Sequence, residues 1–554
     1  MERSGLLIVC GALGAAGALV GCFDKGVLLA NTGGGGNAQG GGGGAGGAGG
    51  AGAEGGAGGV GGQGGATSSS SEGGGGCEPC YEGPAGTEGV GACKGGCRQG
   101  GTCEHQVVPG AEDCATAEDE TCDGGSGTCD GAPTWSVQIG GGGEQRGLDI
   151  TFDGGGNILV AGSFSGQTDF ANSLGSTDGF VVKLMPEGGQ RDWPTVFGGS
   201  GTDLCSAVAR DRNDNVIVAG NFEGTVNFGG TTFISQGSDV FVAKLDPGGT
   251  LLWIKRISGP NSDNAYGVAV DSENNIFVAG MFSNSANVLD ETTMRGGGGE
   301  DIFVVKIDAE GHHVWNSHFG DTSPQAALDV AVAPDDNVVV AGRVAGTVRF
   351  GQEVYVATSH DAFVAKLDGT TGVPLWSRGF GDTMDQEFTS VAVGKDGNIA
   401  VAGNTKGEIR VGGLPLPYGG ETDAVVAAFR ADGTHLWSHT YGDGEDQRAL
   451  GVAVDEAGNV LLVGDFESRI DFKRRLLTSN GGFDAFVAKL APADGETLWA
   501  TSFGDGGEQR AAAVAVDPLG NIALTGNFSG SIDLGGPPLT SVTGQDALVA
   551  RLQP

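Results

Sequence analysis

The chain has 554 residues, of which 111 are glycine and 18 are proline. Because the glycines follow no Gly-X-Y register, this composition excludes a collagen-type fibre. With 30 Lys and Arg against 68 Asp and Glu, the net charge is −38 at pH 7. That charge excludes a general nucleic-acid-binding surface, because such a surface displaces phosphate counterions with basic side chains.

Residues 1–22 are expected to direct export. The apolar run from Gly5 to Gly21 is short for a membrane span, which needs about 20 residues, and it suits the hydrophobic region of a signal peptide. The run ends at Leu19-Val20-Gly21-Cys22 and so resembles a bacterial lipoprotein signal. The resemblance implies that Cys22 is lipidated and anchors the protein at the outer membrane or cell surface. An ordinary secretory peptide is the alternative.

Residues 23–76 are predicted to be a disordered tether. Positions 33–65 hold 22 glycines in 33 residues, and serines follow at positions 68–71. A segment of this composition buries too little apolar surface to fold, and it behaves as a flexible linker. We expect it to act as a spacer that holds the rest of the chain away from a membrane.

Residues 77–130 form a predicted cysteine-rich module. An even number of cysteines in a short exported segment favours a disulfide framework, whose connectivity the sequence leaves open. Zinc binding is the alternative, on the spacing of Cys77 to Cys80 and of Cys93 to Cys97. The eight cysteines are Cys77, Cys80, Cys93, Cys97, Cys103, Cys114, Cys122 and Cys129.

The same module carries acidic turns and a wider resemblance. Asp119, Glu120 and Asp123 could hold Ca²⁺, but a solvated turn is the favoured interpretation, and no other cofactor is expected. The run 83–93, with Glu112-Asp113-Cys114 and the segment 119–124, resembles cysteine-rich segments of myxobacterial surface lipoproteins. This resemblance implies a location and no activity.

All the tryptophans lie after residue 130 and mark a repeat of about 60 residues, a period typical of a solenoid or a propeller. Each repeat contains four short apolar segments separated by Gly, Asp and Asn, which predicts four β-strands. The region begins with a Trp strand and ends with the final strand of a repeat, so the first strand can complete the last sheet and remove exposed edges. The tryptophans are Trp135, Trp193, Trp253, Trp315, Trp376, Trp437 and Trp499.

The repeats resemble the bacterial β-propeller repeat family called SBBP. The resemblance rests on Asp-Ala-Phe-Val-Ala-Lys-Leu at 361–367 and 484–490, on Leu-Trp pairs and on the Val-Ala-Val-Asp string from Val452. It covers residues 135–554 and implies a propeller at the cell envelope or outside, without an assigned activity. We therefore expect an all-β fold in which residues 131–554 form a seven-bladed β-propeller of four-stranded blades, closed by its N- and C-terminal strands.

Residues that recur once in every repeat are expected to be structural. The tryptophans should pack between blades. An Asp begins each final strand and should bind backbone N–H groups of the turn before it, and an Asn in each hairpin should adopt the left-handed conformation. The aspartates are Asp178, Asp239, Asp301, Asp361, Asp423, Asp484 and Asp546, and the asparagines are Asn157, Asn215, Asn275, Asn337, Asn398, Asn459 and Asn521.

Positions that break the repeat are the candidate ligand-binding residues. The loop that leads into each Val-Ala-Val strand carries arginine in the first, sixth and seventh repeats, at Arg146, Arg448 and Arg510, and these repeats are neighbours in a closed ring. Acidic residues precede them at Glu144, Asp446 and Glu508. Three guanidinium groups could bind a carboxylate or phosphate. The alternative is that each arginine pairs with the acid of its own loop. Long connections such as 224–238 share this face and are expected to add hairpins.

Catalytic motifs are missing from the sequence: it contains no Gly-x-Ser-x-Gly, His-Glu-x-x-His or phosphate-loop pattern. His312, His313 and His318 cluster at one hairpin, and we expect them to be surface residues and not metal ligands. We expect a non-enzymatic, monomeric lipoprotein that binds a partner protein or a glycan polymer through its loop-rich face. The alternatives are an extracellular polysaccharide hydrolase or lyase and a structural envelope protein.

Overall fold

The computed structural model describes residues 78–80, 96–99, 102–104, 131–534 and 537–554. The predicted signal peptide with Cys22, the tether, and Cys77, Cys93, Cys114, Cys122 and Cys129 lie outside these residues. In the cysteine-rich segment, β1 (Glu78–Cys80), β2 (Gly96–Gln99) and β3 (Thr102–Glu104) form an antiparallel sheet. Cys80, Cys97 and Cys103 belong to these strands, and the disulfide framework stays a prediction. No helix in the described part of the chain is long and apolar enough to cross a bilayer.

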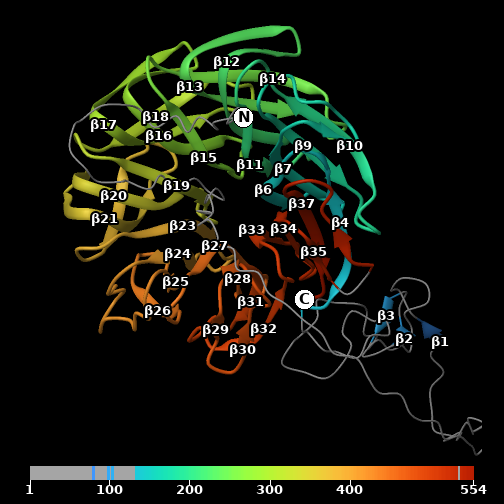
Figure 1. Ribbon diagram of the computed structural model, residues 1–554. Helices are drawn as coiled ribbons and strands as arrows, with labels where there is room; N and C mark the ends of the chain where they lie inside the picture. The colour runs from blue at the N-terminus through green and yellow to red at the C-terminus, as the bar shows by residue number, and fades with distance from the viewer. Residues whose placement is uncertain (1–77, 81–95, 100–101, 105–130, 535–536) are drawn as a thin grey trace, which may run out of the picture.

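The remainder of the described chain is a ring of antiparallel sheets around a central axis (Figure 1). Each sheet has a Val-Ala-Val-type strand on the inside. These innermost strands are β6 (Gln145–Phe152), β11 (Leu204–Arg210), β15 (Asp263–Val270), β19 (Gln325–Val332), β23 (Gln386–Val393), β27 (Gln447–Val454) and β33 (Gln509–Val516). Each of them contacts the innermost strand of the next sheet, and β33 contacts β6. The ring is therefore closed.

Two central strands follow outward in each sheet. The first set is β7 (Ile158–Phe164), β12 (Val216–Phe228), β16 (Ile276–Val288), β20 (Val338–Phe350), β24 (Ile399–Thr405), β28 (Val460–Phe466) and β34 (Ile522–Phe528). The second set is β9 (Asp178–Leu184), β13 (Thr231–Leu245), β17 (Thr292–Ile307), β21 (Glu353–Leu367), β25 (Asp423–Phe429), β31 (Asp484–Leu490) and β37 (Asp546–Leu552).

The tryptophan strands lie on the outside, at β10 (Arg191–Phe197), β14 (Leu251–Ser258), β18 (His313–Phe319), β22 (Pro374–Phe380), β26 (His435–Tyr441), β32 (Thr497–Phe503) and β4 (Pro133–Ile139). As predicted, the N-terminal strand β4 completes the last sheet by pairing with β37, Pro133 opposite Leu552 and Ile139 opposite Ala547. Five sheets have four strands. An eight-stranded sheet arises because β14 also pairs with β16, through Ile257 and Val288.

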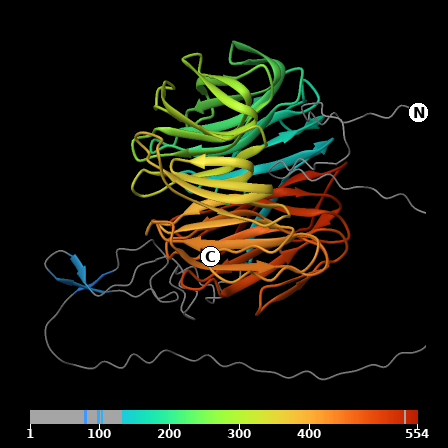
Figure 2. The same ribbon diagram turned by 90° about the vertical axis from the view of Figure 1, so that its left-hand side faces the viewer.

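The connections between the two central strands lie on one face of the ring and build projecting hairpins, as expected. In the second, third and fourth repeats the two central strands continue along their own direction as paired extensions, which we call arms, at residues 225–234, 285–295 and 346–357. Elsewhere short separate pairs form, β5 (Gly141–Gly142) with β8 (Gln167–Thr168), β29 (Arg469–Asp471) with β30 (Leu476–Thr478), and β35 (Ser531–Ile532) with β36 (Leu539–Thr540). Figure 2 shows the ring from the side.

The core lies between neighbouring sheets. Leu159 and Val181 of the first sheet pack against Val208, Val216 and Phe241 of the second, all nearly inaccessible to solvent. Apolar surface removed from water on this scale is the main stabilising contribution to the fold. Because every sheet is covered on both sides by its neighbours, each central strand reads as an apolar run.

The tryptophans latch each sheet to the next, which confirms their packing role. The indole N–H donates to a backbone carbonyl of the following hairpin, as from Trp135 to Pro186 at 2.8 Å and from Trp437 to Pro492 at 2.9 Å. Trp193, Trp253, Trp315 and Trp376 make the corresponding bond. The Trp499 N–H is the exception among the described residues, because it is buried without a partner. In the next sheet, β37 and β4 come from opposite ends of the chain segment that forms the ring and are not joined by a hairpin, so the usual carbonyl is missing there.

In five repeats the recurring aspartate closes the turn before it as predicted, since one carboxylate oxygen accepts an N–H from four residues earlier, for example Gly297 to Asp301 at 2.7 Å. These five are Asp178, Asp301, Asp423, Asp484 and Asp546, whereas Asp239 accepts from Gly259. The reason given for the asparagines is wrong. The left-handed residue is the one before each Asn, such as Asp214 or Gly458. In five repeats the asparagine instead binds the Asp that opens the hairpin, as Asn459 binds Asp455 at 2.8 Å. In the other two, Asn337 and Asn398 bind the Asp two residues before them.

Candidate ligand-binding mouth

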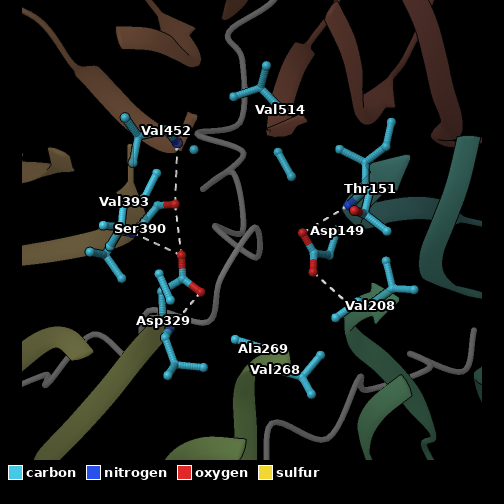
Figure 3. Close-up of a pocket in the computed structure, with 18 of the residues that line it drawn as sticks. Asp149, Thr151, Val208, Val268, Ala269, Asp329, Ser390, Val393, Val452 and Val514 are labelled. Atoms are coloured by element: carbon cyan, nitrogen blue, oxygen red, sulfur yellow. Dashed lines mark hydrogen bonds between the residues drawn. The ribbon is translucent and has the colours of Figure 1, made fainter. Parts of the chain in front are cut away.

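The centre of the ring is a cavity of about 350 Å³ lined by the innermost strands (Figure 3). Its polar groups are engaged in holding those strands together. Asp149 accepts the Val208 N–H at 2.8 Å, and Asp329 accepts both the hydroxyl of Ser390 at 2.9 Å and the N–H of Val391 at 3.0 Å. These carboxylates link adjacent innermost strands, and their oxygens accept the hydrogen bonds that form the link.

At one end of this cavity, the first residues of the innermost strands pair with residues of the neighbouring central strands and form a ring that we call the mouth. The residues of the mouth differ from repeat to repeat, unlike the tryptophans that bind neighbouring sheets to each other. The opposed pairs are Arg146 with Ser163, Leu204 with Asn221, Asn264 with Met281, Ala326 with Arg343, Glu387 with Asn404, Arg448 with Asp465, and Arg510 with Asn527.

The structure brings Arg448 and Arg510 together on one carboxylate, that of Asp465. Each arginine Nε lies 2.6 Å from an Asp465 oxygen. The Asp465 side chain is fully buried, and those of Arg448 and Arg510 are 6% and 12% exposed. The Arg448 guanidinium also lies over the Phe483 ring at 3.9 Å. Two guanidinium groups thus share one negative charge in a water-poor site, where electrostatic effects are strong.

Arg146 belongs to the same group. It pairs with Glu144 of its own loop at 2.9 Å, as the alternative interpretation predicted for all three arginines, and its side chain is 17% exposed. Burial lowers the pKa of Arg510, Asp465 raises it, and the positive charges of Arg448 and Arg146 lower it again, so that it lies below its ordinary value. Three guanidinium groups against the carboxylates of Asp465 and Glu144 leave one net positive charge in this part of the mouth.

The other predicted acids do not pair with their own arginines in the described structure. Asp446 and Glu508 instead contribute to an acidic rim with Glu467. Burial raises the pKa of Glu467, and the charges of Asp446 and Glu508 raise it further. The charge of Arg448 acts on Glu467 in the opposite direction, so the acidic rim lies beside the basic group.

Sequence reasoning missed Asp465 and a second buried pair in the mouth, Arg343 with Glu387 at 3.0 Å. Burial lowers the pKa of Arg343, but the charge and hydrogen bond of Glu387, together with the electrostatic effects of Tyr266 and Glu300, raise it above its ordinary value. Both omissions share one cause. The position at the start of the innermost strand varies from repeat to repeat, but the opposed position on the next strand, which is Ser, Asn, Met, Arg, Asn, Asp and Asn in the seven repeats, varies just as much and carries the partners.

Cysteine and histidine add no reactive cluster to the mouth. Cys205 is fully buried, and burial raises the pKa of its thiol. His312 and His313 bind their own hairpin through Asp308 and Asn316. Within the described ranges, no group of three or more His, Cys, Asp or Glu side chains is placed to hold a metal ion.

A closed ring of four-stranded sheets with a variable mouth defines a β-propeller protein. The family described as Beta-propeller repeat, SBBP, matches residues 252–281, in agreement with the expected resemblance. An uncharacterized WD repeat-containing protein of Acanthamoeba polyphaga mimivirus, L264, is 23% identical over 439 residues, which are 62% of this chain and 32% of the viral protein. The Regulatory protein FlaEY of Caulobacter vibrioides is 28% identical over 180 residues, which are 31% of this chain and 18% of that protein.

The chain thus spans about a third or less of the length of these two relatives. Among solved structures, the Dos1 propeller covers 76% of this chain, with 94% of its own length aligned, at 10% identity and a TM-score of 0.38. A likeness of this size carries no argument about ligand or activity.

Proposed function

We propose that this protein is a non-enzymatic binding propeller whose mouth accepts a carboxylate or phosphate group of a partner protein or polymer. Counting the eight-stranded sheet as two gives seven blades, one for each tryptophan repeat. The observation that carries the proposal is the state of the buried Arg448 guanidinium. Its Nε donates to the Asp465 carboxylate, whereas its Nη2 is buried with no hydrogen-bond partner. An unsatisfied charged donor is costly, and an incoming oxyanion would relieve that cost.

The surroundings support an anion over a cation. Arg146 and Arg510 lie close enough to act on each other electrostatically, and Arg146 is partly open to solvent. Charge-assisted hydrogen bonds from arginine are strong and geometrically selective. The partner would reach past the acidic rim with a single anionic group, which favours a protein side chain or a polymer with spaced charges over a dense polyanion.

Binding of the full-length protein to immobilised polygalacturonate, dextran sulfate and neutral dextran at 0.15 M salt tests this proposal. We expect polygalacturonate to bind more strongly than dextran sulfate, a dense polyanion, and neutral dextran not to bind. Arg146→Ala leaves the buried triad of Arg448, Arg510 and Asp465 in place and should weaken binding to polygalacturonate about tenfold, the loss of one charge-assisted contact. Arg410→Ala, in an exposed pair with Glu408, is the matched control and should bind like the unaltered protein.

Binding to polygalacturonate that is unchanged in Arg146→Ala would contradict the assignment of the mouth as the binding site. Release of oligosaccharides from any of these polymers by the unaltered protein would instead support the hydrolase or lyase alternative.

We further propose that the protein is exported and anchored through a lipid on Cys22, so that the ring faces outward on its tether. Metabolic labelling with a fatty-acid analogue and membrane fractionation test this. Cys22→Ser should abolish the label and move the protein to the soluble fraction, and a labelled Cys22→Ser protein would contradict the anchor assignment.

A further inference from the structure

A second cavity lies away from the mouth, between two of the arms. It has a volume of about 510 Å³ and is bounded by the arm at 285–295, the arm at 346–357 and the end of β18. This volume is in the range of small-molecule sites. Its lining includes the basic residues Arg295 and Arg349, the acidic residues Asp301 and Asp321, and His318.

Two arginines of this cavity, Arg295 and Arg349, have no ion-pair or hydrogen-bond partner for their side chains among the described residues. In the following repeat, Arg410 stands where Arg349 does, and it pairs with Glu408 two residues before it at 3.0 Å. The residue two before Arg349 is Thr347. Arg349 thus lacks the neutralising acid of its counterpart, although acids outnumber bases more than twofold in this protein.

Arg295 departs from the repeat in the same way. It is opposite Ser285 in its arm, and the corresponding positions of the arms before and after it hold Ile234, opposite Thr225, and Val356, opposite Thr347. The fold therefore accepts an aliphatic side chain at this place. An arginine here serves neither the packing of the arm nor an ion pair, and its free guanidinium faces the same cavity as Arg349.

The floor of the cavity is acidic and largely preformed. Asp301 is 1% exposed; one oxygen accepts the Gly297 N–H at 2.7 Å, and the other is buried without a partner, as in the corresponding aspartates of most other repeats. Asp301 therefore contributes its negative charge to the floor and makes no direct contact with a ligand. Asp321 accepts the N–H groups of Ser323 and Thr347, each at 2.7 Å. Burial and the Asp321 charge raise the pKa of Asp301 to about 6, so both groups are negatively charged at neutral pH. A dianionic phosphate would be repelled by this floor, whereas hydroxyl groups would be bound by it.

We propose that this cavity binds a hexuronate, a sugar ring that carries one carboxylate and several hydroxyls, as a free monosaccharide or at a chain end. Arg295 and Arg349 bind the carboxylate, a geometry to which the guanidinium fork is suited. Asp321, which is only partly buried, accepts from the hydroxyl groups. The His318 ring, packed edge-on against Phe282 at 5.8 Å between centroids, forms a wall for the ring of the sugar. The ligand is thus selected by its single negative charge and its hydroxyls together.

Titration calorimetry and saturation-transfer NMR on the full-length protein, with galacturonate, glucuronate, galactose and inorganic phosphate as probes, test this site. We expect binding of a uronate and no measurable binding of galactose or phosphate. Arg295→Ile and Arg349→Asn introduce residues that other arms carry at these positions, Ile234 and Asn287, so both variants should fold. Each should weaken uronate binding about tenfold or more.

One control variant and one mouth variant separate this site from the mouth. Arg410→Asn is the control and should leave uronate binding unchanged, because Arg410 does not line the cavity. Failure of both uronates to bind at millimolar concentration would overturn the proposal, as would equal binding of galactose. Phosphate binding as tight as that of the uronate would overturn the assignment of the ligand class, and loss of uronate binding in Arg146→Ala alone would move the sugar to the mouth.

Discussion

Replacing Asp465 by asparagine should destabilise the ring more than any surface substitution, because it leaves two buried guanidinium groups without their shared counter-charge. Asn has the same shape as Asp, so packing is kept and only the charge is lost. Breaking a buried ion pair by removing one partner costs about 3–5 kcal/mol, and the burial of Asp465, Arg448 and Arg510 places this site in that class.

The expected change in melting temperature follows from the size of the ring. An unfolding entropy of about 2.1 cal/mol/K per residue gives roughly 0.9 kcal/mol/K for a ring of about 420 residues, so Asp465→Asn should lower Tm by about 3–6 °C in a thermal scan. Glu408→Gln, in the exposed pair with Arg410, is the matched control and should shift Tm by less than about 1 °C.

A triple variant, Asp465→Leu with Arg448→Met and Arg510→Met, tests whether the destabilisation comes from unpaired charge or from loss of the contacts that the three side chains make. If the cost comes from unpaired charge, this variant should recover most of the stability, since apolar replacements of buried ion pairs are often neutral or stabilising. An unchanged Tm in Asp465→Asn, or a triple variant as unstable as the single one, would refute the reasoning.

Three further predictions concern the scaffold. Gly464→Ala should cost about 1–3 kcal/mol by chemical denaturation, because its Cβ would lie 1.8 Å from a backbone oxygen, whereas Gly506→Ala, with nothing within 4 Å, should be neutral; equal effects would contradict the steric argument. Trp437→Phe should cost about 1 kcal/mol more than Trp499→Phe, since only Trp437 donates an N–H, and equal losses would show that the latch bond contributes nothing. Burial raises the pKa of Asp263 to about 8, so the folded state binds a proton that the unfolded chain releases above about pH 4, and stability should fall as pH rises toward 8. Asp263→Gln should abolish that part of the pH dependence and raise Tm at pH 8 more than at pH 5; parallel pH profiles for variant and parent would refute it.

The scaffold could be predicted from the sequence because its residues repeat. The closing pair of β4 with β37, the innermost position of the Val-Ala-Val strands and the packing of Trp437 all follow from a pattern present in every repeat. The hairpin chemistry was misjudged at Asn459, because a single-residue propensity for the left-handed region could not show that Gly458 before it takes that conformation. In that case a side-chain bond decided the role, and only the folded turn displays it.

The candidate sites were harder to predict because their residues meet across strands. Arg448 and Arg510 occupy neighbouring repeats, which predicted that they lie close together. In the structure both guanidinium groups bind the carboxylate of Asp465. Nothing in the spacing of residues along the chain indicates that the Asp465 carboxylate lies between the two guanidinium groups in space. Arg295 and Arg349 lie 54 positions apart on different arms, and the arms acquire a common cavity only when two sheets stand side by side in the ring.

The seam between β4 and β37 also determines how the ring responds to mechanical load. Pro133 is opposite Leu552, so the chain segments before β4 and after β37 leave the ladder at the same end. A force on the segment before Pro133 therefore opens the backbone bonds one pair at a time, as a zipper opens, and does not strain them all at once in shear. Every other outer strand of the ring is tied to its neighbour by a covalent hairpin. Under tension from its N-terminal side, the ring has one point of failure, and detaching β4 leaves the last sheet with three strands and a free edge.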